Sequence, residues 1–122
     1  MNVAELHLPA ESAYVAVLRM TTAGLAARVD FTLDDIEEVR MAVGEACALV
    51  LPGAREDGVL RARFELGAGT IKVTVSADTD DSEGPDLDSF GWQVLAALVD
   101  DLAAGHRSGA HYVSFAVTSE TA

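Results

Sequence analysis

The sequence has little of what stabilises secreted proteins or anchors proteins in membranes. Its one cysteine, Cys47, has no partner for a disulfide, which favours a reducing compartment. The longest apolar run holds about a dozen residues and contains Glu45, whereas crossing a bilayer takes roughly 20. No basic stretch precedes an apolar one near Met1, so we expect no signal peptide. These absences predict a cytoplasmic protein.

Positive charge is also scarce. The chain has 8 Lys and Arg residues against 20 Asp and Glu residues, giving a formal net charge of −12. A surface this acidic repels phosphate backbones and anionic lipid. The composition therefore argues against nucleic acid or a membrane as the direct ligand. It favours either plain solubility or a protein partner with a basic face.

What the chain does have is enough apolar sequence for one core. Half of its 122 residues are hydrophobic, and a chain of this length fits a single domain. No internal repeat or linker interrupts the pattern. We therefore expect one domain over residues 1–122.

Hydrophobic periodicity predicts four strands and three helices. The strands are expected at residues 3–8, 60–66, 71–77 and 111–117, the second and third forming a hairpin. The first helix is expected at residues 11–29, with a stripe of Tyr14, Val17, Leu18, Thr21, Leu25 and Val29. A second helix opens with a capping box at residues 32–35 and ends near residue 51. The third begins near residue 89, carries the stripe Phe90, Val94, Leu98 and Leu102, and ends at Gly105.

The resulting order, β-α-α-β-β-α-β, predicts an α/β two-layer sandwich. We expect a mixed sheet of four or slightly more strands, with three helices on one face. An acidic loop, residues 78–88, separates the hairpin from the third helix. It lacks the glycine and the distal glutamate of an EF-hand, and the three histidines are dispersed, so no metal site is predicted.

Glu45 is the most unusual residue of the second helix. It lies in the most apolar stretch of the chain, and its own helix face carries Met41, Ala42, Ala48 and Leu49. A buried carboxylate is unfavourable unless it is paired or has a chemical role. Two interpretations stay open: a functional acid, or an acid left in a pocket that has lost its ligand.

Three segments resemble one protein family in their order and spacing. They are A-V-G-E-A-C-A-L at residues 42–49, F-G-W-Q-V-L-A-A-L-V-D-D-L at residues 90–102 and S-G-A-H-Y-V at residues 108–113. Together they resemble the small anti-sigma factors of the RsbW and SpoIIAB type, which have the histidine-kinase-like ATPase (Bergerat) fold. The sequence around Gly91 is most similar to that of the actinobacterial, UsfX-like branch.

The resemblance implies an ATP and Mg²⁺ site, but the chain departs from the family pattern there. Glu45 stands at the general base, while Leu49 replaces the asparagine that holds Mg²⁺, and leucine has no donor oxygen. Asp78 lies near the family's adenine-reading aspartate. The glycine-rich phosphate lid is reduced to Gly84 and Gly91, and carboxylates of the acidic loop would repel a triphosphate. We therefore expect a degenerate site with a vestigial Glu45 and no cofactor.

Arg19 is the predicted partner contact. It lies 26 positions before Glu45, a spacing that matches an arginine with which the family binds its sigma factor and its antagonist. Its expected neighbours Val15, Thr22 and Ala23 form a mild apolar face with Arg19 at the centre, a composition typical of interfaces. The alternative is a solvated arginine on an outer helix face.

The function predicted from this resemblance is sequestration of an alternative sigma factor of RNA polymerase, with release by an anti-anti-sigma protein of the STAS type. The resemblance also implies a homodimer. Two alternatives stay open: an active ATP-dependent serine kinase that phosphorylates its antagonist, with Glu45 as base, and a structural dimerisation domain that keeps only the fold.

Overall fold

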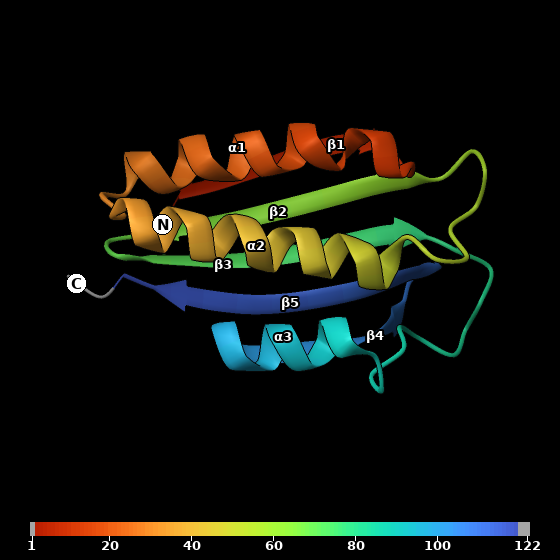
Figure 1. The fold of residues 1–122 in the computed structure, drawn as a ribbon. Helices are drawn as coiled ribbons and strands as arrows, with labels where there is room; N and C mark the ends of the chain where they lie inside the picture. The colour runs from red at the N-terminus through yellow and green to blue at the C-terminus, as the bar shows by residue number, and fades with distance from the viewer. Residues whose placement is uncertain (1, 120–122) are drawn as a thin grey trace.

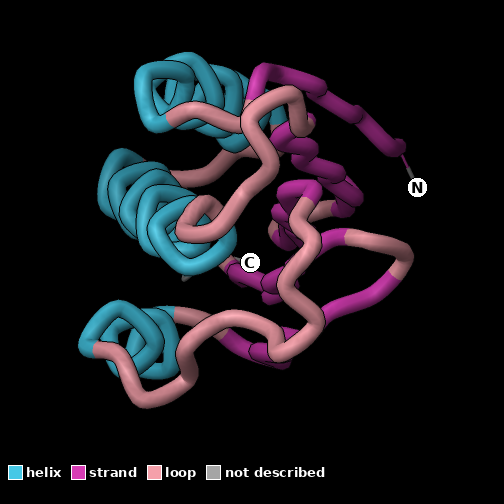
Figure 2. The backbone as a smooth tube through the Cα atoms, turned by 90° about the vertical axis from the view of Figure 1, so that its right-hand side faces the viewer, coloured by secondary structure: helices cyan, strands magenta, loops and turns pink. Residues whose placement is uncertain are grey.

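The computed structural model describes residues 2–119 as two layers (Figure 1). Within these residues one sheet is covered on one face by three α-helices, and the other face carries no helix (Figure 2). The α/β two-layer sandwich is therefore confirmed. The core lies between the layers and includes Leu18, Val43, Phe64, Leu95 and Phe115, all almost fully buried.

The sheet of the described chain has five strands in the order β1-β2-β3-β5-β4. The predicted mixed sheet is wrong, because every neighbouring pair is antiparallel. The chain runs from β3 through α3 and β4 before it returns as β5, which pairs with β3 and leaves β4 at the edge. The strands are β1 (Asn2–Pro9), β2 (Val59–Gly67), β3 (Thr70–Asp78), β4 (Asp100–Arg107) and β5 (Ala110–Thr118).

The predicted helix over residues 99–105 is wrong, because α3 (Phe90–Leu98) stops at Leu98 and β4 follows at once. A spacing of four between Leu98 and Leu102 suits a helix, but it also suits inward positions of a strand. The deciding feature is the hairpin turn. Ser108 and Gly109 both have positive φ, 55° and 76°, as a type I′ turn between antiparallel strands requires.

Helix α2 (Leu33–Val50) begins where the sequence predicts. The Thr32 hydroxyl accepts from the Asp35 backbone N–H at 3.1 Å, and the Asp35 carboxylate accepts from the Thr32 N–H at 3.2 Å. This reciprocal pair satisfies two backbone donors that the first turn would otherwise leave free. Asp35 is buried and also accepts from the Ser119 hydroxyl at 2.8 Å. The cap therefore ties α2 to the end of β5.

Helix α1 (Val15–Arg28) differs from the prediction in its start and in the face that it buries. A short 3-10 turn, η1 (Ser12–Tyr14), precedes it. Its fully buried residues are Leu18, Thr22 and Ala26, whereas Tyr14 and Val17 are exposed. The helix is rotated relative to the predicted stripe because it packs beside α2 as well as over the sheet (Figure 2).

Cys47 lies on the buried face of α2. Burial raises the pKa of its thiol to about 12, against a smaller lowering influence of the Arg19 charge. The thiol is therefore protonated at neutral pH and inert. No helix within residues 2–119 is both long and apolar enough to cross a membrane.

Candidate functional site: two hollows on either side of Glu45

A hollow of about 410 Å³ lies beside the C-terminal half of α2, between that helix, the acidic loop and the start of α3. We call it the α2–α3 hollow. Four positions that the family resemblance assigns to a nucleotide site meet there: Glu45 and Leu49 from α2, Gly84 from the acidic loop and Gly91 from α3. The other lining residues are Ala48, Pro52, Asp81, Pro85, Asp86, Ser89 and His111.

Glu45 is half-buried in the structure rather than ringed by apolar side chains. The neighbours Met41 and Ala48 are exposed, because the outer face of α2 is open to solvent. On its other side Glu45 meets the first turn of α3. A Cβ added to Gly91 would lie 2.9 Å from Glu45 Oε2, so only glycine leaves room for this approach without a shift.

The chemistry of the α2–α3 hollow does not suit a Mg²⁺-nucleotide. Leu49 lines it and offers no ligand oxygen. Three carboxylates line it, from Glu45, Asp81 and Asp86, and no Lys or Arg is among the lining residues. Phosphates bound without basic side chains need several backbone N–H groups, and the walls offer one helix N-terminus, that of α3. The residues present therefore do not fit the triphosphate that the family resemblance implies.

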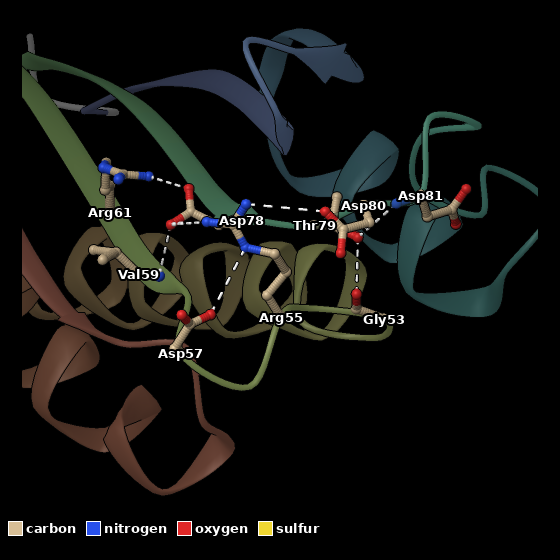
Figure 3. Close-up of polar contacts among 9 residues, drawn as sticks. All are labelled: Gly53, Arg55, Asp57, Val59, Arg61, Asp78, Thr79, Asp80 and Asp81. Atoms are coloured by element: carbon tan, nitrogen blue, oxygen red, sulfur yellow. Dashed lines mark hydrogen bonds and ion pairs between the residues drawn. The ribbon is translucent and has the colours of Figure 1, made fainter.

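Asp78 does not belong to this hollow, which corrects its prediction as a nucleotide-site residue. On β3 the odd-numbered Val75 and Ala77 are buried under the helices, so Asp78 points to the open face of the sheet. There its carboxylate accepts from Arg61 Nη1 at 2.6 Å and from the Val59 backbone N–H at 2.9 Å, with Arg55 3.8 Å away (Figure 3).

These partners lower the pKa of the Asp78 carboxyl below its usual 3.8. The hydrogen bond from Arg61 is the main cause, and partial burial opposes it. The charged carboxylate is therefore the form that the native structure favours. Asp78 joins β2, β3 and the segment that follows α2, which is a structural role.

The acidic loop is held in place by its first residues and by β5. The buried Thr79 donates to the Gly53 carbonyl at 2.8 Å and accepts from the Asp81 N–H at 3.1 Å (Figure 3). His111 is 2 % exposed, and its Nε2 lies 2.9 Å from the Asp81 carbonyl oxygen. Strand periodicity does not predict this contact, which depends on the course of the loop.

Arg19 lies in a second hollow, of about 300 Å³, which we call the α1–α2 hollow. The side chain is half-buried and runs over Gly44, and its Nε is buried with no hydrogen-bond partner within residues 2–119. Glu45 lines this hollow too and so lies between the two. The remaining lining residues are Val15, Glu37, Met41 and Gly44.

The other predicted partner contacts on α1 differ in their exposure to solvent. Val15 and Ala23 are half-buried and so remain partly accessible. Thr22 is buried, and its hydroxyl donates to the Leu18 carbonyl at 2.8 Å. Its side chain cannot reach a partner, so the structure removes Thr22 from the predicted contact surface.

Comparison with known proteins agrees with the fold and with the sequence motifs. Residues 8–115 match the family model of the histidine kinase-like ATPase domain. The serine-protein kinase RsbW of Halalkalibacterium halodurans is 37 % identical, over 70 % of this chain and 52 % of that protein. RsbW of Bacillus cereus (strain G9842) is 42 % identical, over 86 % of this chain and 78 % of that protein.

Solved structures show the same fold at low identity. The structure of the RsbU and RsbW domains of Rv1364c from Mycobacterium tuberculosis superposes with a TM-score of 0.72 at 17 % identity, over 94 % of this chain and 32 % of that one. The catalytic domain of histidine kinase ThkA gives 0.58 at 13 % identity, over 97 % of each chain.

Length separates this chain from some of its relatives. It spans about half the length of the RsbW proteins of H. halodurans and Bacillus velezensis. The family model nevertheless matches most of the chain, and the B. cereus relative is matched over more than two thirds of its length. The chain therefore belongs to the histidine kinase-like ATPase family, in the group of the RsbW serine-protein kinases.

Proposed function

We propose that this protein is an anti-sigma factor that sequesters an alternative sigma factor of RNA polymerase in the cytoplasm. The observation that carries the proposal is the α1–α2 hollow. Arg19 lies in it with an unpaired, buried Nε, beside Met41, which is 51 % exposed. On α1, Val17 and Met20 are also exposed, at 44 % and 71 %. A half-buried arginine among exposed apolar side chains has the composition of a binding hot spot.

The sequestering role does not require phosphorylation by this chain. The lining of the α2–α3 hollow does not fit Mg²⁺-ATP, so we propose that the nucleotide site is degenerate and that Glu45 is vestigial as a catalytic base. Release of the sigma factor is then achieved by a competing anti-anti-sigma protein of the STAS type. We also propose that the protein forms a homodimer. It belongs to the actinobacterial, UsfX-like branch and acts in stress responses.

The overall charge supports a basic partner. A net charge of −12 attracts a protein with a basic face over several ångströms and raises the association rate at low salt. Sigma factors bind DNA through basic surfaces, which an acidic protein could mask. Association with the partner should therefore slow as the salt concentration rises.

The direct experiment is calorimetry of the purified chain with sigma factors and STAS proteins from the same cell. We expect at least one of each class to bind, and Arg19→Ala to weaken sigma binding by about 2–3 kcal/mol, as for a central hot spot. Arg28→Ala, at the exposed end of α1, is the matched control and should change affinity little. Failure of every sigma factor and STAS protein to bind would leave a structural dimerisation domain as the better account.

The second candidate function is an active serine kinase acting on its antagonist. It is favoured by one observation, the convergence of Glu45 and Gly91 on the α2–α3 hollow. Mass spectrometry of the purified protein for bound nucleotide, followed by ATP titration with and without Mg²⁺, distinguishes the two. Micromolar binding that Mg²⁺ strengthens and that Glu45→Gln disrupts would contradict a degenerate site.

A further inference from the structure

Positive charge is scarce in the chain as a whole, but it gathers on the open face of the sheet. Residues that pair across antiparallel strands share a face, and the open face is the one that carries Asp78. Four of the eight Lys and Arg residues of the chain lie on it: Arg61, Arg63, Lys72 and Arg107. Salt screens distant charges beyond about 8 Å, so these local charges decide which ion this face binds.

A hollow of about 300 Å³ lies on this face, between β2, β3 and the β4–β5 turn. We call it the open-face hollow. Ser76 of β3 pairs with Arg61 of β2 on one side and with Tyr112 of β5 on the other, so a short side chain lies between two long ones. Thr74, two residues away on the same face of β3, extends this low floor. The remaining lining residues are Asp78, Arg107, Ser108 and Ala110.

Arg107 lies at the wall of the open-face hollow without a carboxylate partner. Its Cζ is 4.3 Å from the centroid of the Tyr112 ring, a cation–π contact. The ring in turn lies close to β4, since a Cβ added to Gly105 would be 3.2 Å from Tyr112 Cε1. Within residues 2–119, Arg107 forms no ion pair. A guanidinium that is positioned by a ring but not neutralised keeps its N–H groups for an anion.

Arg61 supplies a second guanidinium at the opposite wall. Its Nη1 donates to the Asp78 carboxylate at 2.6 Å (Figure 3), and its side chain is 41 % exposed. Arginine has five N–H donors, so this one bond leaves others for a ligand. The Asp78 carboxylate also accepts from the Val59 backbone N–H and is therefore already paired. Two arginines against one carboxylate give the lining an excess of one positive charge.

Hydroxyl groups make up the rest of the polar lining. They come from Thr74, Ser76, Ser108 and Tyr112, and none of them forms a hydrogen bond within the described chain. Guanidinium and hydroxyl groups are donors that suit phosphate oxygens, and the bonds from guanidinium are charge-assisted. A carboxylate ligand offers only two oxygens and would leave several of these donors unused.

We propose that the open-face hollow binds a phosphate dianion, either free or as the head of a small phosphate ester. Arg61 and Arg107 lie on either side of it, and Ser76 and Thr74 lie beneath. The volume of about 300 Å³ is at the lower end of the range for small-molecule pockets, which leaves room for a short organic part. The inference goes beyond the anti-sigma function and does not depend on it, because it concerns the sheet face opposite to α1 and α2.

The test is a titration of the isotope-labelled full chain, followed by backbone amide NMR shifts at slightly alkaline pH and constant ionic strength. The probes are inorganic phosphate, glycerol phosphate and acetate. We expect saturable shifts at Thr74, Ser76 and Ser108 with both phosphates, with Kd of about 1 mM or below, and acetate binding at least about tenfold more weakly. Tighter binding of glycerol phosphate would identify an ester as the preferred form, and equal binding would identify free phosphate.

Two variants locate the site, and a third is the control. Arg107→Gln should weaken phosphate binding at least about fivefold, because it removes a charge-assisted contact. Ser76→Val should abolish binding by filling the floor, while a β-branched residue suits the strand. Lys72→Gln removes the same charge from an exposed position on the same face that does not line the hollow, and should have less than about a twofold effect.

Three results would overturn the inference. The first is the lack of a saturable shift with either phosphate up to about 20 mM. The second is an equal loss in Lys72→Gln and Arg107→Gln, which would mean general attraction by the whole face. The third is acetate binding as tight as that of phosphate. Arg19→Ala, which tests the anti-sigma function, should leave phosphate binding unchanged, so that either proposal can fail while the other stands.

Discussion

Asp78, on the open face of the sheet, and Glu45, on a helix that covers the other face, are two carboxylates that differ in how fully they are paired. Asp78, on the open face, receives two hydrogen bonds and lies within reach of a second arginine. Glu45, on the helical face, has a glycine backbone on one side and a hollow on the other, with no ion pair in the described chain. A fully paired carboxylate stabilises the fold, whereas an unpaired one in a hollow is available to a ligand.

Replacing Asp78 should produce the largest loss of stability. Asp78→Ala removes the acceptor of Arg61 and of the Val59 N–H, and leaves both donors without their partner. We expect the free energy of unfolding to fall by about 2 kcal/mol in urea denaturation. Asp80→Ala is the control, since Asp80 is exposed and its one ion pair, with Arg55, is long at 3.9 Å. Equal losses in the two variants would contradict the structural role of Asp78.

The contribution of Asp78 should also depend on pH. Its folded-state pKa is lowered, so its stabilisation is fully present above the unfolded-state pKa, near 3.8, and is lost as the pH falls through the lower folded-state value. The stability difference between the wild type and Asp78→Asn should therefore be constant above about pH 5 and shrink below pH 4. Denaturation curves at several pH values measure it. A difference that grows in acid would refute this assignment.

Gly91→Ala should have a smaller effect on stability and of opposite sign. Alanine favours the first turn of α3 by up to about 1 kcal/mol. The one close contact of the new Cβ would be with the flexible end of Glu45, since Ser89 Oγ is at an ordinary 3.9 Å. We expect stability to stay equal or rise, while the Glu45 carboxylate moves away from α3. Chemical shifts of the Glu45 side chain would report the movement; unchanged shifts would mean that the approach seen here is not close in solution.

Glu45→Gln should change stability least, by less than about 0.5 kcal/mol, because no cation in the described chain pairs with the carboxylate. A loss of stability comparable to that of Asp78→Ala would remove the contrast between the two carboxylates and make Glu45 structural.

Several elements could be predicted because the relevant signal is local. The Thr32 cap, the end of α2 before Pro52 and the β2–β3 hairpin follow from short-range chemistry, and all are present. The face of Asp78 was also available from the sequence, since it shares the even parity of Lys72 and Ser76 on β3. The family motif outweighed this alternation and gave the wrong placement.

Other features depend on contacts between distant segments. The stretch after Leu98 satisfies helical and strand spacing equally, and it becomes a strand because the Ser108–Gly109 turn pairs it with the edge of β5. The half-burial of Glu45 depends on where α3 docks, and the burial of Thr22 depends on the α1–α2 contact. His111 acquires its role only from the path of the acidic loop. Local periodicity contains none of this information.

The position of Glu45 between the two hollows has a consequence for mutagenesis. Distant substitutions usually act additively, but residues that share a partner show interaction free energies of about 0.5–3 kcal/mol. Arg19 and Asp86 line different hollows, and Glu45 lines both. A double-mutant cycle gives the interaction free energy between Arg19 and Asp86. Repeating it in the Glu45→Gln background measures whether this one carboxylate couples the two hollows.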